Sequence, residues 1–518
     1  HQPLPAAGLV SRLSPSRPSC RRAGVLLHPT SLPGPGGCGG FGQAAHDWLA
    51  LLGRHGIGVW QLLPLAPTDG TGSPYSSPSG SALNPWLLDA EALVQAGFLE
   101  RTDLEALPGA ADRSGPLDLA AMPARSRALG EALARCWPGQ PVEQHRAFRR
   151  WRHRERGWLP DHALFMVIRR LQGGQPWWQW PAPLARRRRS ALRRIAREQA
   201  GWLLEEELLQ WQLQRQWQQL RQQAERAGVQ LLGDLPFYVA HDSADVWAHR
   251  ALFSLRADGS LTAQSGVPPD YFSATGQLWG TPVYRWPLHL LSGFRWWLAR
   301  LQRQFALFDL LRLDHFRALQ AFWSVPGGES TAEHGRWRWF PGWPLLALLW
   351  LRRGLHLPLI AEDLGVITPE VEALRDGFGL PGMKILQFAF DGDPGNPYLP
   401  ANIHGRHWVV YTGTHDNATS VGWWRSLDEG GRRRVAEAVG APITAPAWQL
   451  LELALASSAD LAVVPLQDLL ELDDRARFNT PGTSSGNWTW RLEQPITSLD
   501  GPLQGYGAMA VRYGRGIA

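Results

Sequence analysis

The sequence predicts a single (β/α)8 barrel with inserted segments, an α/β fold, and three observations lead to that class. Eight short apolar runs, rich in Val, Ile and Leu, recur along the chain, and helical stretches separate them. Strands that alternate with helices are typical of a parallel sheet covered by helices. Several runs end at acidic residues, and the carboxyl ends of barrel strands form the rim where functional loops meet.

The eight runs are the predicted strands. In chain order they are Gly24–His28, Gly58–Pro64, Val229–Asp234, Leu310–Asp314, Leu359–Asp363, Lys384–Phe390, Trp408–Thr412 and Leu461–Gln467. With 518 residues the chain is too long for one small core, and a large barrel with insertions accounts for that length. The chain contains no internal repeat and no low-complexity linker, which favours one compact catalytic unit over residues 24–518.

Two insertions interrupt the predicted barrel. The longer covers about residues 66–228 and ends in Trp202–Ala227, whose pattern predicts one long amphipathic helix leading into the third strand. The shorter covers about residues 237–305 and contains GVPPDYFSATGQLWG, Gly266–Gly280, whose Gly and Pro density predicts a loop. Large rings on a loop are candidates for function, and the alternative is a hydrophobic plug that packs the loop down. These rings are Tyr271, Phe272 and Trp279.

The first 23 residues contain Ser, Pro and Arg, but no acid and no apolar segment of the kind found in a secretory signal. We expect residues 1–23 to form a disordered tail, with an organelle transit peptide as the alternative. Three cysteines, Cys20, Cys38 and Cys136, form neither a disulfide framework nor a metal cluster, so a reducing compartment is expected. We therefore predict a cytoplasmic protein or, alternatively, a plastid one. No apolar run reaches the roughly 20 residues that span a bilayer.

The positive net charge does not predict nucleic-acid binding. The formal charge is +6, and every basic residue except Lys384 is arginine, which indicates a compositional bias. The densest basic run, Arg186–Arg194, lacks the interleaved glycines and aromatics of RNA-binding segments, so a solvated helix face is the better interpretation. The 28 Trp include candidates for sugar-binding platforms, because a flat ring matches the apolar face of a pyranose.

Acidic residues lie at the ends of four predicted strands. Asp234 ends the third, Asp314 the fourth, Glu362 and Asp363 the fifth, and Asp416 lies just past the seventh. In a barrel these ends form one rim, where so many negative charges would repel one another unless the site uses them. We interpret them as a catalytic cluster.

Asp314 is flanked by cationic and imidazole side chains. Alternation along a strand puts Arg312 and Asp314 on the same face, where the cation favours the ionised carboxylate. Taken alone, the pair fits a structural ion pair as well as a catalytic carboxylate. The other acids on the rim favour the catalytic interpretation.

Ten segments resemble the 4-alpha-glucanotransferase family, also called amylomaltase or disproportionating enzyme. They run in order from about Gly24 to Arg491: HPTSLPGP (28–35), SPYSS (73–77), GDLPFYVAHDSADVW (233–247), GVPPDYFSATGQLWG (266–280), RLDHFR (312–317), AEDLG (361–365), GMKILQFAFDGDPGNPYLP (382–400), YTGTHDN (411–417), PLQDLL (465–470) and NTPGTSSGNWTWR (479–491). The resemblance implies an amylase-type barrel without a separate C-terminal β-sandwich. It also implies transfer of α-1,4-glucan segments to the 4-OH of an acceptor sugar, with no metal and no organic cofactor.

The resemblance also implies roles for individual residues. It makes Asp314 the nucleophile, Glu362 the general acid/base and Asp416 the transition-state stabiliser. Around the reacting sugar it places Ser73, Tyr75, Asp234, Arg312, His315 and His415. On the loop that covers the cleft it places Asp270, Tyr271, Phe272, Gln277 and Trp279. For the two histidines, a structural role capping strand ends is the alternative.

Retaining cleavage of a glycosidic bond needs two carboxyl groups in different protonation states, one to attack the anomeric carbon and one to protonate the leaving oxygen. A hydrolase and a transferase share this chemistry, so a retaining α-glucan hydrolase of the amylase type is the nearest alternative. A non-catalytic glucan-binding protein would not need the intact acids. The partners implied are malto-oligosaccharides, starch- or glycogen-type α-glucans and glucose as acceptor, with no nucleic acid and no membrane.

The chain departs from the family pattern at four positions. Gly40 stands in a turn that usually carries an acid, and Ala418 replaces the second acid of an HDND segment. Thr281 and Ala318 stand where Asn and Gly are usual. None of these changes removes one of the three catalytic acids; they bear on hydrogen bonds at the rim and on the preferred substrate length.

Overall fold

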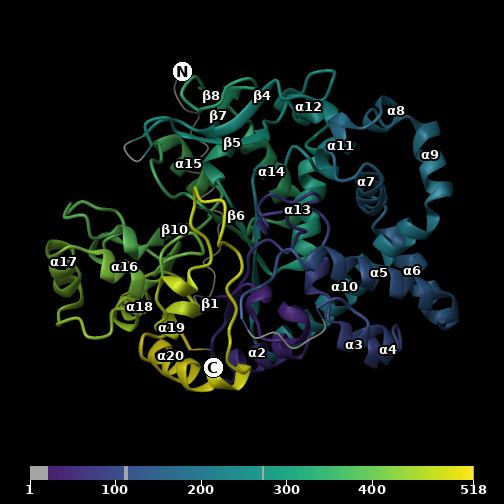
Figure 1. Cartoon of the computed structure of the whole chain (residues 1–518). Coiled ribbons are helices and arrows are strands. Elements are labelled where there is room, and N and C mark those ends of the chain that lie inside the picture. The colour runs from purple at the N-terminus through teal and green to yellow at the C-terminus, as the bar shows by residue number, and fades with distance from the viewer. Residues whose placement is uncertain (1–20, 110–114, 271–272, 517–518) are drawn as a thin grey trace.

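The computed structural model describes residues 21–109, 115–270 and 273–516. At its centre, eight parallel strands form a nearly closed barrel (Figure 1). The strands are β1 (Arg22–Leu26), β2 (Val59–Gln61), β3 (Gln230–Leu235), β6 (Leu310–Leu313), β9 (Leu359–Ala361), β10 (Gly382–Ile385), β11 (Trp408–Tyr411) and β12 (Leu461–Pro465). Each predicted strand overlaps one of these in the same order, so the predicted fold class is confirmed.

A backbone hydrogen bond and the Asp363 side chain join the two end strands and close the barrel. The sheet order is β10-β11-β12-β1-β2-β3-β6-β9, and between the end strands the Ala361 N–H donates to the Pro381 carbonyl at 2.8 Å. The Asp363 carboxylate spans the same gap, because it accepts from the Met383 N–H at 2.9 Å and from Arg375 Nη1 at 2.6 Å. Asp363, the second acid at the end of the fifth predicted strand, is thus a structural residue.

Alternation along the strands separates two apolar cores. One strand face fills the barrel interior, with residues such as Leu26, Leu232, Met383 and Val463. The other face packs against the surrounding helices, as Val25 and Val464 do. The covering helices are α2 (Gln43–Arg54), α10 (Ala200–Ala227), α13 (Arg295–Leu307), α14 (Gly342–Arg353), α15 (Pro369–Gly377), α18 (Pro446–Ala456) and α20 (Asp500–Arg512). Between β10 and β11, a stretch that is described throughout, two 3-10 turns at Leu386–Phe388 and Pro400–Asn402 stand in place of an α-helix.

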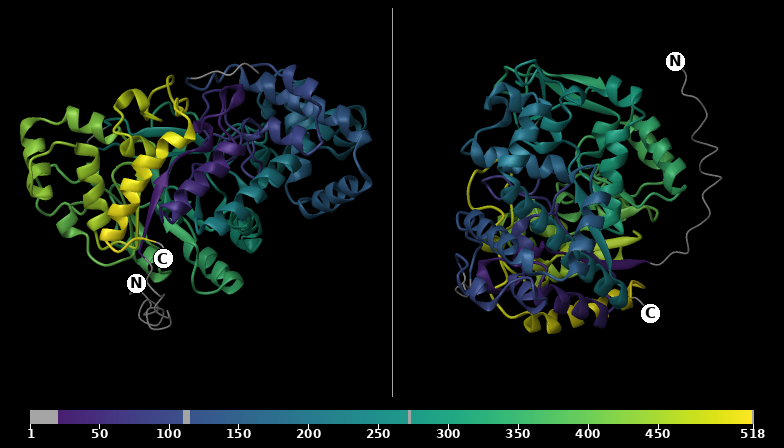
Figure 2. Two further views of the ribbon diagram at one scale, coloured as in Figure 1. Left: turned by 90° about the horizontal axis from the view of Figure 1, so that it is seen from below. Right: turned by 90° about the vertical axis from the view of Figure 1, so that its right-hand side faces the viewer.

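The connection from β2 to β3 forms a helical lobe at one side of the barrel. It contains α3 (Ala90–Gln95), α4 (Arg101–Glu105), α5 (Met122–Cys136), α6 (Val142–Arg154), α7 (Leu159–Leu171), α8 (Ala182–Ala185) and α9 (Arg189–Glu198), and it ends in α10, which includes the predicted long helix. Seen from below, this lobe lies opposite the helices α16 (Ser420–Ser426), α17 (Glu429–Val439) and α18 (Figure 2). Within the basic run, Arg188, Arg189, Arg193 and Arg194 are exposed.

A second, antiparallel sheet lies over the barrel, in the order β5-β4-β7-β8 (Figure 1). Its strands are β4 (Ala263–Val267), β5 (Gln277–Pro282), β7 (Ala321–Pro326) and β8 (Arg336–Trp339). The sequence does not predict this sheet, and the loop predicted over residues 266–280 is wrong at both ends, where β4 and β5 lie. Residue Trp279 therefore lies on strand β5. Strand β8 escaped recognition because its alternation of Arg and Trp covers only four residues, and because all four are exposed, so no buried apolar face marks it.

Strand β1 begins at Arg22, so the last residues of the predicted disordered tail, residues 1–23, belong to the barrel. The rest of that tail, residues 1–20, lies outside the described residues. Among the helices that the structure describes, none combines the length and the apolar character that a membrane crossing requires.

Candidate active site

The carboxyl ends of β3, β6 and β9 bring the predicted acids together. Backbone register pairs Asp234 with Arg312 and Arg312 with Ile360 across these three adjacent strands. Asp314 and Glu362 follow directly at the ends of β6 and β9, and the Glu362 N–H donates to the Leu313 carbonyl at 3.2 Å. Neighbouring parallel strands thus place the two carboxyl groups side by side on one rim.

Arg312 is the buried cation that organises this rim. Its Nη1 donates to both carboxylate oxygens of Asp234 at 2.8 and 3.0 Å, and its Nη2 lies 3.1 Å from Asp314 Oδ1. The Asp234 carboxylate also accepts a hydrogen bond from the Tyr75 hydroxyl. A planar guanidinium with several donors can serve two carboxylates at once, so Arg312 fixes the position of Asp314 relative to the strand.

Asp314 and Glu362 lie in different electrostatic surroundings. Burial raises the pKa of Asp314, and the Arg312 guanidinium acts in the opposite direction. Burial and then the negative charge of Asp314 raise the pKa of Glu362 to about 7. Glu362 accepts hydrogen bonds from the His315 N–H at 2.7 Å and the Leu364 N–H at 3.1 Å. Glu362 therefore holds a proton up to neutral pH, whereas Asp314 faces a fixed cation.

Asp416 reaches the same cleft from the loop after β11. Its Oδ1 accepts from Asn479 Nδ2 at 2.7 Å and lies 3.3 Å from His415 Nε2. Arg477 holds the backbone, because its Nη2 donates to the Asp416 carbonyl at 2.7 Å and its Nε to the Asn479 carbonyl at 2.9 Å. The Asp416 side chain is 46% exposed, so it remains open to a ligand.

The two histidines occupy different settings. His315 has a left-handed backbone, with φ at +53°, and its Nε2 has no hydrogen-bond partner among the described residues. Burial lowers the pKa of His315 to about 3, so the ring is neutral. The Trp279 ring lies 4.8 Å from the His315 ring, and the Tyr75 ring stacks on His415 at 5.1 Å. These contacts fix both imidazoles at the cleft wall.

Most of these groups line one large cleft of about 1670 Å³. The predicted site residues along it are Ser73, Tyr75, Asp270, Gln277, Trp279, Arg312, Asp314, His315, Glu362, His415 and Asp416. Asp234 lies beneath, joined to the cleft through Arg312 and Tyr75. Tyr271 and Phe272 lie outside the described residues. Across the described ranges, no three His, Cys, Asp or Glu side chains are grouped to hold a metal ion.

The comparisons with known proteins agree with this geometry. A family profile described as 4-alpha-glucanotransferase matches residues 27–497. The chain belongs to the 4-alpha-glucanotransferase family. The predicted transferase activity is thereby confirmed over the alternative of an amylase-type hydrolase.

The similar proteins cover nearly the whole chain. The 4-alpha-glucanotransferase of Thermus thermophilus is 46% identical over 488 residues, which are 91% of this chain and 95% of that protein. The enzyme of Synechocystis is 44% identical, with 91% and 94% covered. Among solved structures, the amylomaltase from Streptococcus agalactiae in complex with acarbose matches with a TM-score of 0.92 at 33% identity, over 96% of this chain and all of that one.

Sequence reasoning missed several residues of this glucanotransferase site. The segment NTPGTSSGNWTWR, Asn479–Arg491, carries part of the family resemblance, but sequence reasoning assigned no role to Asn479 and none to Arg477. Both are polar residues in a long irregular stretch after β12, so no strand end or periodicity marked them. Other lining residues that it left unassigned are Thr414, Tyr398, Phe388, Trp337 and Trp488.

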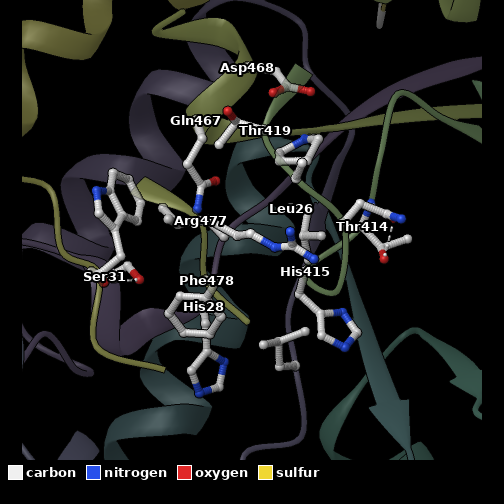
Figure 3. Close-up of a pocket in the computed structure, with 16 residues that line it drawn as sticks. Leu26, His28, Ser31, Thr414, His415, Thr419, Gln467, Asp468, Arg477 and Phe478 are labelled. Atoms are coloured by element: carbon white, nitrogen blue, oxygen red, sulfur yellow. Dashed lines mark hydrogen bonds between the residues drawn. The ribbon is translucent and has the colours of Figure 1, made fainter. Parts of the chain in front are cut away.

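A small pocket of about 30 Å³ lies on the far side of His415 (Figure 3). Its lining includes His28, Ser31, Arg477 and Phe478. Arg477 reaches across it toward the loop that carries His415 (Figure 3). The space suits about one water molecule rather than a sugar, so the pocket belongs to the support of the Asp416 loop.

The departures from the family pattern also have visible settings. A Cβ at Gly40 would lie 2.5 Å from the Leu87 carbonyl oxygen, so this turn cannot accept an acidic side chain without moving. Ala418 lines the small pocket, and its carbonyl accepts from Gln387 Nε2 at 2.9 Å. The Thr281 hydroxyl is hydrogen-bonded to Ser265, and Ala318 is buried.

Proposed function

We propose that this glucanotransferase moves α-1,4-glucan segments by a retaining double displacement through a covalent glycosyl-enzyme. The observation that supports this most strongly is the unequal setting of two carboxyl groups on adjacent strands: Arg312 pairs with Asp314, while Glu362 has a pKa of about 7. A retaining mechanism requires one ionised and one protonated carboxyl group beside the same bond.

In the first half-reaction, the Asp314 carboxylate attacks the anomeric carbon of the donor sugar. The bond from that carbon to the leaving O4 breaks, and Glu362 transfers its proton to this oxygen. The products are a glucan with a new non-reducing end and a glycosyl ester on Asp314. Arg312 balances the charge of Asp314 before the attack.

In the second half-reaction, the ionised Glu362 takes the proton from the 4-OH of an acceptor sugar. The acceptor oxygen attacks the anomeric carbon, and the ester bond to Asp314 breaks. Two inversions leave the transferred segment with its original α configuration. Glu362 ends protonated and Asp314 ionised, which is the starting state.

Asp416 binds hydroxyls of the reacting sugar, in contacts that strengthen as positive charge develops at the anomeric carbon. The hydrogen bond from Asn479 keeps one Asp416 oxygen in place and leaves the other for the sugar. The neutral His315 ring is suited to a sugar hydroxyl, since its Nε2 has no partner among the described residues. We assign Ser73, Tyr75 and His415 to the same sugar.

The acceptor side of the cleft decides between transfer and hydrolysis, because a bound sugar must compete with water for the glycosyl-enzyme. We assign this role to Asp270, Gln277 and Trp279, together with Tyr271 and Phe272. Trp279 is 40% exposed at the cleft wall, which leaves its ring free to stack on a sugar.

The proposed substrates are malto-oligosaccharides and starch- or glycogen-type α-glucans, with glucose as an acceptor. The similar amylomaltase from S. agalactiae was solved with acarbose, which supports a ligand of this class. A reducing compartment is supported by Cys38 and Cys136, which are both free thiols. We propose the cytoplasm; the alternative, a plastid, has support in the similar plant enzymes that are named as chloroplastic.

Incubation with maltotriose tests the activity. We expect glucose and longer malto-oligosaccharides to appear while the total number of reducing ends stays constant, because each transfer makes one bond for each bond it breaks. A rise in reducing ends that matches the bonds broken would show a hydrolase. No turnover on maltotriose or on longer glucans would refute the enzyme.

A further inference from the structure

Strand β8 presents an exposed aromatic surface at the edge of the antiparallel sheet. All four residues, Arg336–Trp339, are exposed, with Trp337 43% and Trp339 54% accessible. β8 is an outer strand of the sheet, since the order is β5-β4-β7-β8. Large apolar side chains that lie exposed side by side are a common mark of a binding surface.

The two tryptophans share the sheet face that borders the cleft. Trp337 pairs with Trp323 and Trp339 with Ala321 across β7, and residues two apart on a strand point to the same face. Ala321 and Trp337 both line the cleft. Trp339 is the next position on this face and pairs with the cleft residue Ala321, so the aromatic surface adjoins the substrate site.

Neighbouring side chains hold both rings in place. The Arg317 guanidinium lies 4.0 Å from the centre of the Trp337 ring, and Trp323 packs against that ring edge-on at 5.3 Å. The Trp339 ring meets the Trp286 ring edge-on at 5.4 Å. Rings that are fixed before binding lose little conformational freedom on contact with a ligand.

We propose that Trp339, next to Trp337, forms an outer glucan platform that binds the part of an α-glucan chain extending out of the cleft. The inference rests on the proposed function and deepens it by adding a determinant of chain length. Two rings on one strand face are about 7 Å apart, which allows separate stacking on sugars of one chain.

The composition of the surface favours a sugar over a protein as the occupant. Polar side chains lie beside the rings, because Arg317, next to Trp337, and Gln320 both line the cleft, and their donors match hydroxyl groups. Strand β8 contributes no aliphatic side chain to this surface. The centre of a protein–protein interface would need a larger continuous apolar surface than these two rings provide. The position of Trp339 also favours a glucan, because its neighbours Ala321 and Trp337 line the cleft proposed to hold that ligand.

The test compares amylose with maltotriose, using kcat/KM for each. Trp339→Ala is expected to lower the amylose-to-maltotriose ratio of kcat/KM about 3- to 10-fold, the loss of one aromatic stacking contact. Trp343→Ala is the matched control, since Trp343 is equally exposed, at 56%, but lies on α14 against Phe378. The control should keep the wild-type ratio. In an inactive Asp314→Ala background, calorimetry should show the same loss in linear dextrin affinity for Trp339→Ala.

The outcomes separate this inference from the proposed function. Wild-type protein that disproportionates maltotriose, with an unchanged ratio in Trp339→Ala, overturns the outer platform alone. Wild-type protein that transfers nothing overturns the proposed function. A change in oligomeric state of Trp339→Ala in light scattering, with the ratio unchanged, would assign β8 to contact with a second copy of the chain and would also overturn the glucan platform.

Discussion

Arg312 Nη2 lies 3.1 Å from the Asp314 carboxylate, and this contact distinguishes Asp314 from Glu362, the second acid of the proposed mechanism. Within the described residues Glu362 has no comparable cation; its oxygens accept only from backbone N–H groups. Because both carboxyls lie in one desolvated cleft, a fixed positive charge beside one of them biases which acid ionises first. The assignment of nucleophile and proton donor follows from this asymmetry.

Replacing Arg312 by Lys should separate charge from geometry. Lysine keeps the positive charge, but a single ammonium cannot reproduce the fork that reaches Asp234 and Asp314 together. We expect kcat on maltotriose to fall by about 10- to 100-fold. The matched control is Arg375→Lys, which alters the buried pair with Asp363 at the barrel seam. That variant should lower the melting temperature and keep kcat; equal kcat in Arg312→Lys and wild type would contradict the role of Arg312.

The pH dependence of kcat/KM on maltotriose should be bell-shaped. Glu362 must be protonated to act as an acid, so activity falls as pH rises above its pKa of about 7. Asp314 must be ionised, and burial raises its pKa, so activity falls on the acid side at a higher pH than for an ordinary aspartate. With a glycosyl fluoride donor, whose leaving group needs no proton, the alkaline limb of the first half-reaction should disappear. Persistence of that limb would assign it to a different group.

Glu362 should lower the stability of the folded protein at neutral pH. Its pKa is about 7 in the folded state, against an ordinary glutamate pKa of 4.5, so the folded state binds more protons than the unfolded state between these pH values. Stability therefore decreases as pH rises from about 4.5 to 7. The amide of Glu362→Gln cannot ionise. The unfolding free energy of this variant minus that of the wild type should therefore be higher at pH 8 than at pH 5 by on the order of 2 kcal/mol. Urea unfolding at the two pH values measures this change, and a difference that does not vary with pH would contradict it.

The aromatic side chains that we assign to the acceptor side should govern the partition of the glycosyl-enzyme between transfer and hydrolysis. Removing Trp279, Tyr271 or Phe272 weakens acceptor binding by about 1–3 kcal/mol, whereas water remains abundant. In Trp279→Ala, Tyr271→Ala and Phe272→Ala, the ratio of reducing ends formed to glucose transferred should therefore rise, while total turnover falls. An unchanged ratio in all three variants would mean that these rings only pack the loop down.

The sequence predicted the barrel better than it predicted what surrounds it. Runs such as Leu359–Asp363 and Leu461–Gln467 are buried on both faces, and continuous apolar character is a strong local signal. The antiparallel sheet has no such signal, because Arg336–Trp339 is exposed on both faces. Only the assembled fold shows that β7 and β8, from the connection between β6 and β9, join β4 and β5, from the connection between β3 and β6.

The residues of the site also divide into those that a sequence pattern marked and those that it did not. Strand ends alone singled out Asp234, Asp314 and Glu362, since barrel topology gathers such positions on one rim. The same signal also marked Asp363, which the structure shows to be a structural link between β9 and β10. Asn479 could not be found by this reasoning, because it reaches Asp416 from an irregular segment 63 residues further along the chain.

The covalent intermediate on Asp314 is the most direct test of the mechanism. Glu362→Gln, incubated with α-maltotriosyl fluoride, should form the glycosyl ester without needing an acid and should release it slowly without a base. After rapid acid quench and proteolysis, mass spectrometry should find one maltotriosyl group on the peptide that contains Asp314, and none in an Asp314→Ala, Glu362→Gln double variant. A label on Asp416 or another residue, or fluoride release with no labelled peptide, would contradict the double displacement through Asp314.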